Sequence, residues 1–343
     1  MFKKVFSNLL VALFMLLLTS TLIGCGAATP TEEAPATEPP AASATAAPTL
    51  NVMPQRGGPG STSTFASVAP TYQDVPYATL SEAQKLDLYL PTTGTGPFPL
   101  VIMVHGGGFM FGDKSDGGGL AGVDQLLAAG YAVASINYRL SGEATFPAQI
   151  YDVKAAVRFL RANAAQYNLN PDKFGAWGAS AGGNLVSLLG TTCGVPELEG
   201  AELGNADQSS CVQAVVDWFG PIDFLKMQEQ LTAAGCSAST DSANSPESRL
   251  MGAPIQTIPE KVALTNPMNF ITPDDPPFFI ENGTADCNIP PIQNKNFADA
   301  LSAVIGADKV VYISLEGAGH GGAQFETAEN ISKVISFLDQ YLK

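Results

Sequence analysis

Short apolar runs that alternate with helical patterns constrain the fold of this chain more than any other feature. Leu100–Val104 and Ala132–Ile136 are almost continuously apolar, which is typical of strands buried on both faces of a sheet. Ala148–Tyr167 follows them and has apolar residues at the spacing of one helix face. Because strands that alternate with helices usually pair in parallel and are covered on both sides, the pattern predicts an α/β fold with a mostly parallel sheet.

The same pattern continues along the chain and predicts a sheet of about eight strands with helices on both faces. Lys85–Leu90 alternates polar and apolar residues, which predicts a strand at the edge of the sheet. Further buried strands are expected at 174–177, 212–219, 278–281 and 310–315, and further helices at 181–189, 297–304 and 331–342. The segments 190–210 and 225–263 are less regular. We expect these two segments to form a small lid or wall beside the functional site.

The N-terminal region has the composition of an export signal followed by a spacer. Lys3 and Lys4 precede the apolar run Leu9–Leu18, which predicts a lipoprotein signal peptide over residues 1–24. This segment ends in Leu-Ile-Gly-Cys, which resembles a bacterial lipobox and predicts lipidation of Cys25. An ordinary signal peptide, which would leave Cys25 as a free thiol, is the alternative. The predicted location is therefore the extracytoplasmic side of a bacterial membrane or the cell surface.

A change of composition near residue 70 predicts where the folded domain begins. Residues 25–70 are rich in Ala, Thr, Pro and Gly, and such a segment buries too little apolar surface to offset its ordering entropy. We therefore expect a disordered tether at 25–70 and a single folded α/β domain at 71–343. Apolar residues make up 45% of the chain, which is enough for a sizeable core.

The charge balance limits the partners of the chain. Its 343 residues include 32 acidic and 17 basic side chains, a formal net charge of −15. This balance argues against nucleic acid and against anionic lipid headgroups as partners, and it suits a neutral or cationic substrate. Contact with a membrane is expected only through Cys25.

Four cysteines besides Cys25 are expected to form disulfides, because export brings a chain into an oxidising compartment. Four cysteines allow three connectivities. Local closure favours Cys193–Cys211, which leaves Cys236–Cys287. Four free buried thiols are the alternative. The sequence contains no Cys-x-x-Cys pair, so no metal or redox site is predicted.

The sharpest chemical signal is a G-x-S-x-G motif, Gly178-Ala179-Ser180-Ala181-Gly182, at the junction of a predicted strand and a predicted helix. This is the context of a nucleophile elbow, a sharp turn that exposes its serine. Side chains in place of Gly178 and Gly182 would clash where the backbone segments approach each other. The motif therefore predicts Ser180 as a nucleophile, with the helix N-terminus directed at developing negative charge.

The chain contains only two histidines, and a serine hydroxyl needs an adjacent base at neutral pH. His320 lies in a glycine-rich loop after the last predicted strand and is predicted to be this base. His105 begins a His-Gly-Gly-Gly run that matches the oxyanion-hole motif of lipases and esterases. We expect His105 and Gly106 to support this glycine loop. The alternative for either histidine is a core residue, which their places in glycine-rich turns at strand ends disfavour.

The third member of such a site is a carboxylate that orients the histidine. Asp286 follows a buried strand and lies between Ser180 and His320, which is the chain order expected for this fold. Asp223 is the rival, at the end of the preceding strand. The position of Asp286 after its strand favours Asp286 over Asp223.

As a set, these motifs resemble the α/β-hydrolase carboxylesterases, and the resemblance covers residues 72–343. Within them the chain is similar to the bacterial branch near hormone-sensitive-lipase-like esterases and bifunctional acetylxylan/feruloyl esterases. The resemblance implies an oxyanion hole formed by the backbone N–H groups of Gly107, Gly108 and Ala181. It also supports Asp286 as the acid. One departure is Asn282-Gly283, where many relatives have a histidine and a glycine.

The resemblance implies a serine esterase that forms an acyl-Ser180 intermediate without a cofactor or metal. The expected substrates are short-chain acyl or aryl esters of the acetyl or feruloyl type, either small molecules or esters carried by a polysaccharide. A serine peptidase of the prolyl-oligopeptidase type is the first alternative. A non-catalytic surface binding protein on a hydrolase scaffold is the second, and the presence of the serine, the acid and both glycine motifs disfavours it.

Overall fold

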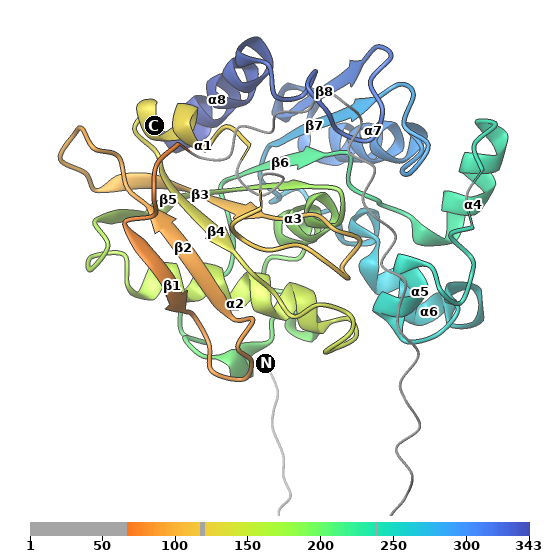
Figure 1. Cartoon of the computed structure of the whole chain (residues 1–343), viewed down its shortest axis with the longest axis horizontal. Helices are drawn as coiled ribbons and strands as arrows, with labels where there is room; N and C mark the ends of the chain where they lie inside the picture. The colour runs from red at the N-terminus through yellow and green to blue at the C-terminus, as the bar shows by residue number, and fades with distance from the viewer. Residues whose placement is uncertain (1–66, 117–120, 238) are drawn as a thin grey trace, which may run out of the picture. The chain divides into compact units, whose positions relative to one another are not determined.

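A computed structural model describes residues 67–116, 121–237 and 239–343 (Figure 1). In this part of the chain one sheet of eight strands has the order β1-β2-β4-β3-β5-β6-β7-β8. Strands β1 and β2 pair antiparallel, as do β2 and β4, whereas all pairs from β4 to β8 are parallel. The predicted mostly parallel sheet is confirmed. The strands are β1 (Tyr72–Pro76), β2 (Lys85–Tyr89), β3 (Phe98–Val104), β4 (Ala132–Ile136), β5 (Leu169–Ala179), β6 (Ala214–Trp218), β7 (Phe278–Gly283) and β8 (Val310–Leu315).

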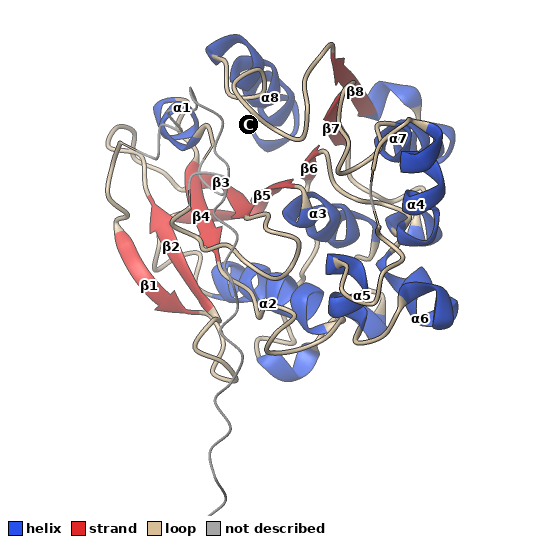
Figure 2. Cartoon of the chain, turned by 45° about the vertical axis from the view of Figure 1, so that its right-hand side comes forward, coloured by secondary structure: helices blue, strands red, loops and turns tan. Residues whose placement is uncertain are grey.

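Helices cover both faces of the sheet (Figure 2). Those that pack on one face are α1 (Val123–Ala128) and α8 (Ala328–Leu342), and those on the other are α2 (Ala148–Ala162), α3 (Ala181–Thr191) and α7 (Ile292–Ile305). The short helices α4 (Phe224–Ala233), α5 (Pro246–Met251) and α6 (Pro259–Val262) lie between β6 and β7 in the chain.

Strand β3 shows why the core has two layers. Its side chains alternate between the faces, so Leu100, Ile102 and Val104 pack with α2 and α3, whereas Val101 and Met103 pack with α1 and α8. All five are buried. A strand that is apolar at every position therefore has a helix layer on each side.

The prediction that Lys85–Leu90 is an edge strand is wrong. Strand β2 lies between β1 and β4, and β1 forms the edge. Asp87 gives β2 its alternating pattern, but the residue is buried, and its carboxylate forms an ion pair of 3.0 Å with the ammonium group of Lys114. The polar residue in the alternation therefore faces a buried partner and not water, while β1 is mostly exposed and has no apolar pattern of its own.

The two segments that lack a regular sequence pattern, 190–210 and 225–263, differ in structure. Residues 225–263 contain most of α4 together with α5 and α6, which are short helices, two of them beginning at a proline. Residues 190–210 contain two single-turn 3-10 helices, Pro196–Leu198 and Ala201–Leu203, that pack beside α2.

Several predictions fall on residues that the structure does not describe. The signal peptide at 1–24, the lipidated Cys25 and most of the tether at 25–70 lie outside the described residues. Among the residues that are described, no helix has the length and apolar character needed to cross a bilayer.

Candidate active site

The G-x-S-x-G motif forms the turn from β5 into α3. Ser180 has φ 56° and ψ −122°, a backbone conformation that is costly for a residue with a side chain and that typically occurs at functional sites. Its N–H donates to the carbonyl oxygen of Trp218 at 2.9 Å. A Cβ atom on Gly178 would lie 2.2 Å from the carbonyl oxygen of Gly182, and one on Gly182 would lie 2.0 Å from that of Val104. Both positions therefore require glycine, for the predicted reason.

His320 lies in the loop after β8 and contacts the serine directly. Its Nε2 is 2.8 Å from the Oγ of Ser180, and its Nδ1 is 2.8 Å from the Oδ2 of Asp286. The ring of Phe219 packs edge-on against the imidazole, with 4.7 Å between the ring centroids. When Nδ1–H donates to Asp286, Nε2 presents its lone pair to the serine hydroxyl, which is the arrangement a general base requires.

Asp286, and not Asp223, is the carboxylate beside His320. The Oδ1 of Asp286 accepts hydrogen bonds from the backbone N–H groups of Asn288 at 2.7 Å and Ile289 at 3.0 Å, which leaves Oδ2 for the histidine. The side chain is fully buried. Asp223 instead caps the N-terminus of α4, where its Oδ1 accepts from the N–H of Leu225 at 3.2 Å. Three buried acceptor contacts fix the orientation of Asp286, and through it that of the imidazole.

The glycine run after β3 lies against the serine turn. A Cβ atom on Gly106 would lie 2.9 Å from the carbonyl oxygen of Ala179 and 3.3 Å from the Cβ of Ser180. Gly108 and Ala181 line the cavity in front of Ser180, together with Phe109. Their N–H groups donate no hydrogen bond to another described group. Gly107 does not line this cavity, and its role in the oxyanion hole stays a prediction; a Cβ there would lie 2.1 Å from the carbonyl oxygen of Phe111.

His105 is held behind this glycine run. Its Nδ1–H donates to the carbonyl oxygen of Gly106 at 2.7 Å, and its ring stacks on that of Tyr138 at 4.4 Å between centroids. The phenol of Tyr138 donates to the backbone carbonyl of His105 at 3.0 Å. Burial lowers the pKa of His105, which favours the neutral ring. These contacts agree with a structural role for His105 and Gly106 in shaping the loop.

A cavity of about 540 Å³ opens in front of Ser180 and His320. One wall is formed by residues 237 and 239–247, which follow α4 and include the first two residues of α5; we name them the lid segment. Most of its lining side chains are hydroxyls, an amide and a carboxyl group: Ser237, Ser239, Thr240, Ser242, Asn244, Ser245 and Glu247. The expectation that 225–263 contributes a lid or wall beside the site is confirmed. No residue of 190–210 lines this cavity, so the same expectation for that segment is wrong.

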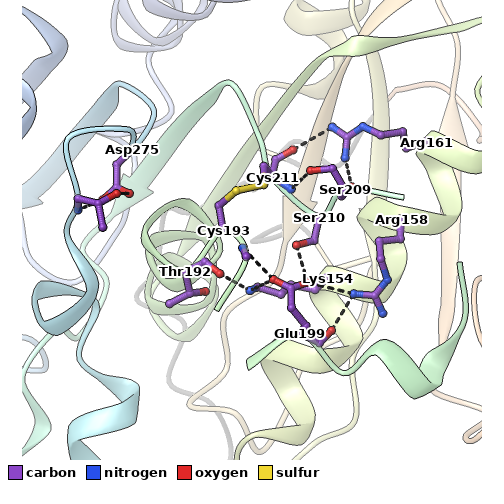
Figure 3. Close-up of a disulfide and its surroundings, with 12 residues drawn as sticks. Lys154, Arg158, Arg161, Thr192, Cys193, Glu199, Ser209, Ser210, Cys211 and Asp275 are labelled. Carbon is purple, nitrogen blue, oxygen red and sulfur yellow. Dashed lines mark hydrogen bonds and ion pairs between the residues drawn. A yellow bond between two sulfur atoms is a disulfide. The ribbon is translucent and has the colours of Figure 1, made fainter. Parts of the chain in front are cut away.

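Both predicted disulfides are present. Cys236–Cys287 joins the turn after α4 to the residue after Asp286, and Cys287 lines the cavity. Cys193–Cys211 lies away from it, beside α2 (Figure 3). There the carboxylate of Glu199 accepts from the ammonium of Lys154 at 2.6 Å and from the hydroxyl of Ser210 at 2.8 Å. This buried ionic cluster explains why residues 190–210 pack against α2.

Two further carboxyl groups lie buried below the site, on strands β6 and β7. Asp217 accepts from the hydroxyl of Ser187 and from the N–H of Gly220, both at 2.9 Å. Burial raises the pKa of Asp217 to about 6 and that of Glu281 to about 7. The amide of Asn330 donates to Glu281 at 2.8 Å. Sequence reasoning missed both acids, because a single carboxylate inside an apolar strand resembles an exposed position.

Comparison with known proteins identifies the family. The BD-FAE family profile matches residues 86–301. The esterase LipC of Mycobacterium tuberculosis is 33% identical over 243 residues, which are 70% of this chain and 57% of LipC. The carboxylic ester hydrolase LipM of the same organism, described as probable, is 30% identical over 72% of this chain and 55% of its own length. This chain thus spans about half the length of these relatives.

Two solved structures are also similar to the chain. A bifunctional GH43-CE protein of Bacteroides eggerthii has 38% identity and a TM-score of 0.72, over 78% of this chain and 35% of that protein. A truncated carbohydrate esterase from gut microbiota has 36% identity and a TM-score of 0.71, over 82% of this chain and 98% of that protein. With the sheet, the serine turn and the histidine loop described above, these matches establish that the chain belongs to the BD-FAE family of α/β-hydrolase esterases.

Proposed function

We propose that this chain hydrolyses carboxylic esters through a covalent acyl-enzyme formed on Ser180. The observation that carries the proposal is the continuous chain of short hydrogen bonds from Asp286 through His320 to Ser180, at the floor of a cavity. This is the geometry of a nucleophile, its base and the group that orients the base. The names of the similar proteins, among them esterases and a carbohydrate esterase, support the same reaction class.

In the first half of the reaction, the Oγ of Ser180 attacks the ester carbonyl carbon while Nε2 of His320 takes the hydroxyl proton. The carbonyl oxygen becomes an oxyanion, and the free N–H groups of Gly108 and Ala181 are positioned to stabilise it. The tetrahedral intermediate then collapses, the bond to the alcohol oxygen breaks, and that oxygen receives the proton from His320. Buried Asp286 stabilises the imidazolium in the meantime.

In the second half, a water molecule adds to the acyl carbon while His320 takes one of its protons. The bond between the acyl carbon and Oγ breaks, and the proton returns to Ser180. The products are a carboxylic acid and the free enzyme. This chain's residues therefore move one proton back and forth at Nε2 of His320, which requires no oxidant or reductant.

The proposed substrates are short acyl or aryl esters, of the acetyl or feruloyl type, whose alcohol is a carbohydrate. The hydroxyl-rich lid segment supports a polar alcohol, since such a wall leaves few apolar contacts for a lipid chain. The carbohydrate esterases among the similar structures point the same way.

The test is hydrolysis of p-nitrophenyl acyl esters, methyl ferulate and an acetylated glycoside by the wild type and by Ser180→Ala. We expect the variant to lose turnover by orders of magnitude. Asp286→Asn should also lose most activity, whereas Asp223→Asn is the matched control and should keep it. A wild type that hydrolyses peptides but no ester would replace the proposal with the serine peptidase. A wild type that hydrolyses neither, and is not labelled by an active-serine phosphonate, would indicate a binding protein.

We also propose that Cys25 is lipidated and holds the enzyme on the extracytoplasmic side of a bacterial membrane. The lipobox-like segment before it and the two disulfides support this location, because disulfides persist in oxidising compartments. Expression of the full chain in bacteria with detergent extraction tests it. Cys25→Ser should release the protein from the membrane fraction, and a wild type that is freely soluble with an unmodified Cys25 would contradict the anchor.

A further inference from the structure

Two buried polar atoms without a hydrogen-bond partner lie on the lid segment and not in the catalytic machinery. They are the Oε2 of Glu247 and the Oγ1 of Thr240. Glu247 is 5% exposed and Thr240 is 8% exposed, and both residues line the cavity in front of Ser180. Burying a polar atom without a partner is costly, so two such residues lining one cavity require an explanation.

Several other groups of the lid segment already have hydrogen-bond partners. The N–H of Thr240 donates to the side-chain oxygen of Gln228 at 2.8 Å, and the hydroxyl of Ser245 caps α5 by accepting from the N–H of Ser248 at 3.1 Å. The carboxylate of Asp241 accepts from Gln256 at 2.9 Å. The Cys236–Cys287 disulfide anchors the start of the segment. The two unpartnered atoms are therefore fixed before any ligand arrives, which is how a recognition site is preorganised.

The chemistry of the pair selects the ligand group. Thr240 offers a hydroxyl, which both donates and accepts, and Glu247 offers a carboxyl group whose burial raises its pKa. The nearby carboxylate of Asp241 acts in the same direction. A hydroxyl group can donate to Glu247 and accept from Thr240 at once, whereas an ammonium group can only donate. A neutral hydroxyl also avoids burying a cation in a cavity whose other lid side chains are uncharged.

Resting on the proposed esterase function, we propose that Glu247 and Thr240 form a subsite that hydrogen-bonds a hydroxyl group of the substrate. The subsite makes the enzyme prefer esters of polyhydroxylated alcohols over esters of apolar alcohols of equal size. Pro246 joins this subsite to the site of chemistry, because its ring lies where a Cβ atom on Gly108 would meet it at 3.3 Å. The subsite is thus adjacent to the loop that is proposed to bind the oxyanion.

The test compares three substrates that differ in the alcohol: a monoacetylated methyl glycoside, cyclohexyl acetate and p-nitrophenyl acetate. The variants are Thr240→Val and Glu247→Leu, which remove the polar atoms at similar volume, and Glu247→Gln, which keeps the ability to hydrogen-bond. We expect kcat/KM on the glycoside ester to fall about 10- to 100-fold in the first two variants and less in Glu247→Gln. Activity on the other two esters should change little.

Thr93→Val is the matched control, because it makes the same substitution as Thr240→Val at an exposed position that does not line this cavity. It should leave the glycoside-to-cyclohexyl ratio unchanged. Thermal unfolding and the rate of labelling by an active-serine phosphonate verify that each variant is folded.

Four outcomes would overturn the inference, one of them measured on a fourth ester, acetylthiocholine. An unchanged glycoside-to-cyclohexyl ratio in Thr240→Val and Glu247→Leu would remove the subsite while leaving the esterase intact. An equal loss on all three esters would reduce both residues to a structural role. A larger loss on acetylthiocholine than on the glycoside ester would assign Glu247 to an ammonium group instead. A wild type that hydrolyses none of these esters would overturn the proposed function itself, and this inference with it.

Discussion

Replacing both Cys236 and Cys287 with serine removes a cross-link between residues 51 apart, and replacing both Cys193 and Cys211 removes one between residues 18 apart. Cross-linking lowers the entropy of the unfolded chain by an amount that grows with the logarithm of loop length. This entropy effect stabilises the folded chain by about 4 kcal/mol for Cys236–Cys287 and about 3 kcal/mol for Cys193–Cys211 at 25 °C. Each double serine variant leaves no unpaired thiol among these four cysteines, so the two losses of stability compare directly.

The two variants should differ in catalysis more than in stability. Cys287 follows Asp286 directly and lines the cavity, and its partner Cys236 lies after the end of α4, immediately before the lid segment. Without this bond, the loop that orients His320 gains freedom. A displacement of about 1 Å in a catalytic group costs about 100-fold in rate. Cys193 and Cys211 lie beside α2, and their loss should leave kcat/KM as in the wild type.

Urea unfolding monitored by circular dichroism gives the stabilities, and kcat/KM on p-nitrophenyl acetate is measured at a temperature where both variants are folded. Equal losses of kcat/KM in the two variants would refute the positioning role of the Cys236–Cys287 bond. A larger loss of stability in the Cys193→Ser/Cys211→Ser variant would refute the loop-entropy reasoning and assign the stability to the buried ionic cluster around Glu199.

Three other changes have outcomes that follow from single contacts. Gly182→Ala places a Cβ atom 2.0 Å from a carbonyl oxygen of β3, and it should lower both the activity and the stability of the enzyme, the stability by about 1–3 kcal/mol. Gly142→Ala is the control, because a Cβ atom there would have no other atom within 4 Å. Equal melting temperatures of the two variants would contradict the predicted clash. Glu281 has its pKa raised from 4.5 to about 7, so the folded state retains the proton to higher pH than the unfolded chain. The ionisation of Glu281 therefore lowers the free energy of unfolding as pH rises from about 4.5 to about 7. Urea titrations of Glu281→Gln over this pH range should show a smaller decline than the wild type. The same decline in both proteins would contradict the effect of burial on Glu281. Asp152→Asn breaks the buried ion pair with Arg139, whose Nη2 lies 2.8 Å from Oδ1 of Asp152. The free energy of unfolding, measured by the same urea titrations, should fall by about 3–5 kcal/mol. A much smaller loss would show that the ion pair is exposed to water.

Ser180, His320 and Asp286, which the structure brings within hydrogen-bonding distance of one another, could be grouped from the sequence because each lies in a local signal. Ser180 lies in a turn that requires glycine on either side, and His320 lies in a glycine-rich loop after a strand. Asp286 was separated from Asp223 by chain order and by its place after β7. All of them follow parallel strands, and the carboxyl ends of such strands meet at one edge of a sheet. Alternation of strands and helices was therefore enough to bring them together in one prediction.

Features that depend on distant partners were missed. The buried position of Asp87 follows from its ion pair with Lys114, which is 27 residues away in the chain. Periodicity cannot distinguish such a residue from one that faces water. The short helices α5 and α6 have six and four residues, too few for an amphipathic pattern to stand out. The irregular appearance of 225–263 reflects short elements fixed by capping and by a disulfide, and not a lack of structure.

The residues that the sequence predicted lie at the ends of the sheet strands, whereas the features that it missed depend on contacts between distant parts of the chain. The sheet holds the nucleophile, base and acid at strand ends, where backbone geometry dictates the residues. The lid segment is an insertion between β6 and β7, and the disulfide and the contact of Pro246 with Gly108 join it to the site. Because the printed side-chain hydrogen bonds of Ser180, His320 and Asp286 involve neither Thr240 nor Glu247, substitutions at these two positions can change which alcohol is accepted without displacing Ser180. We therefore expect substrate preference to vary with the lid segment and reaction type to stay with the sheet.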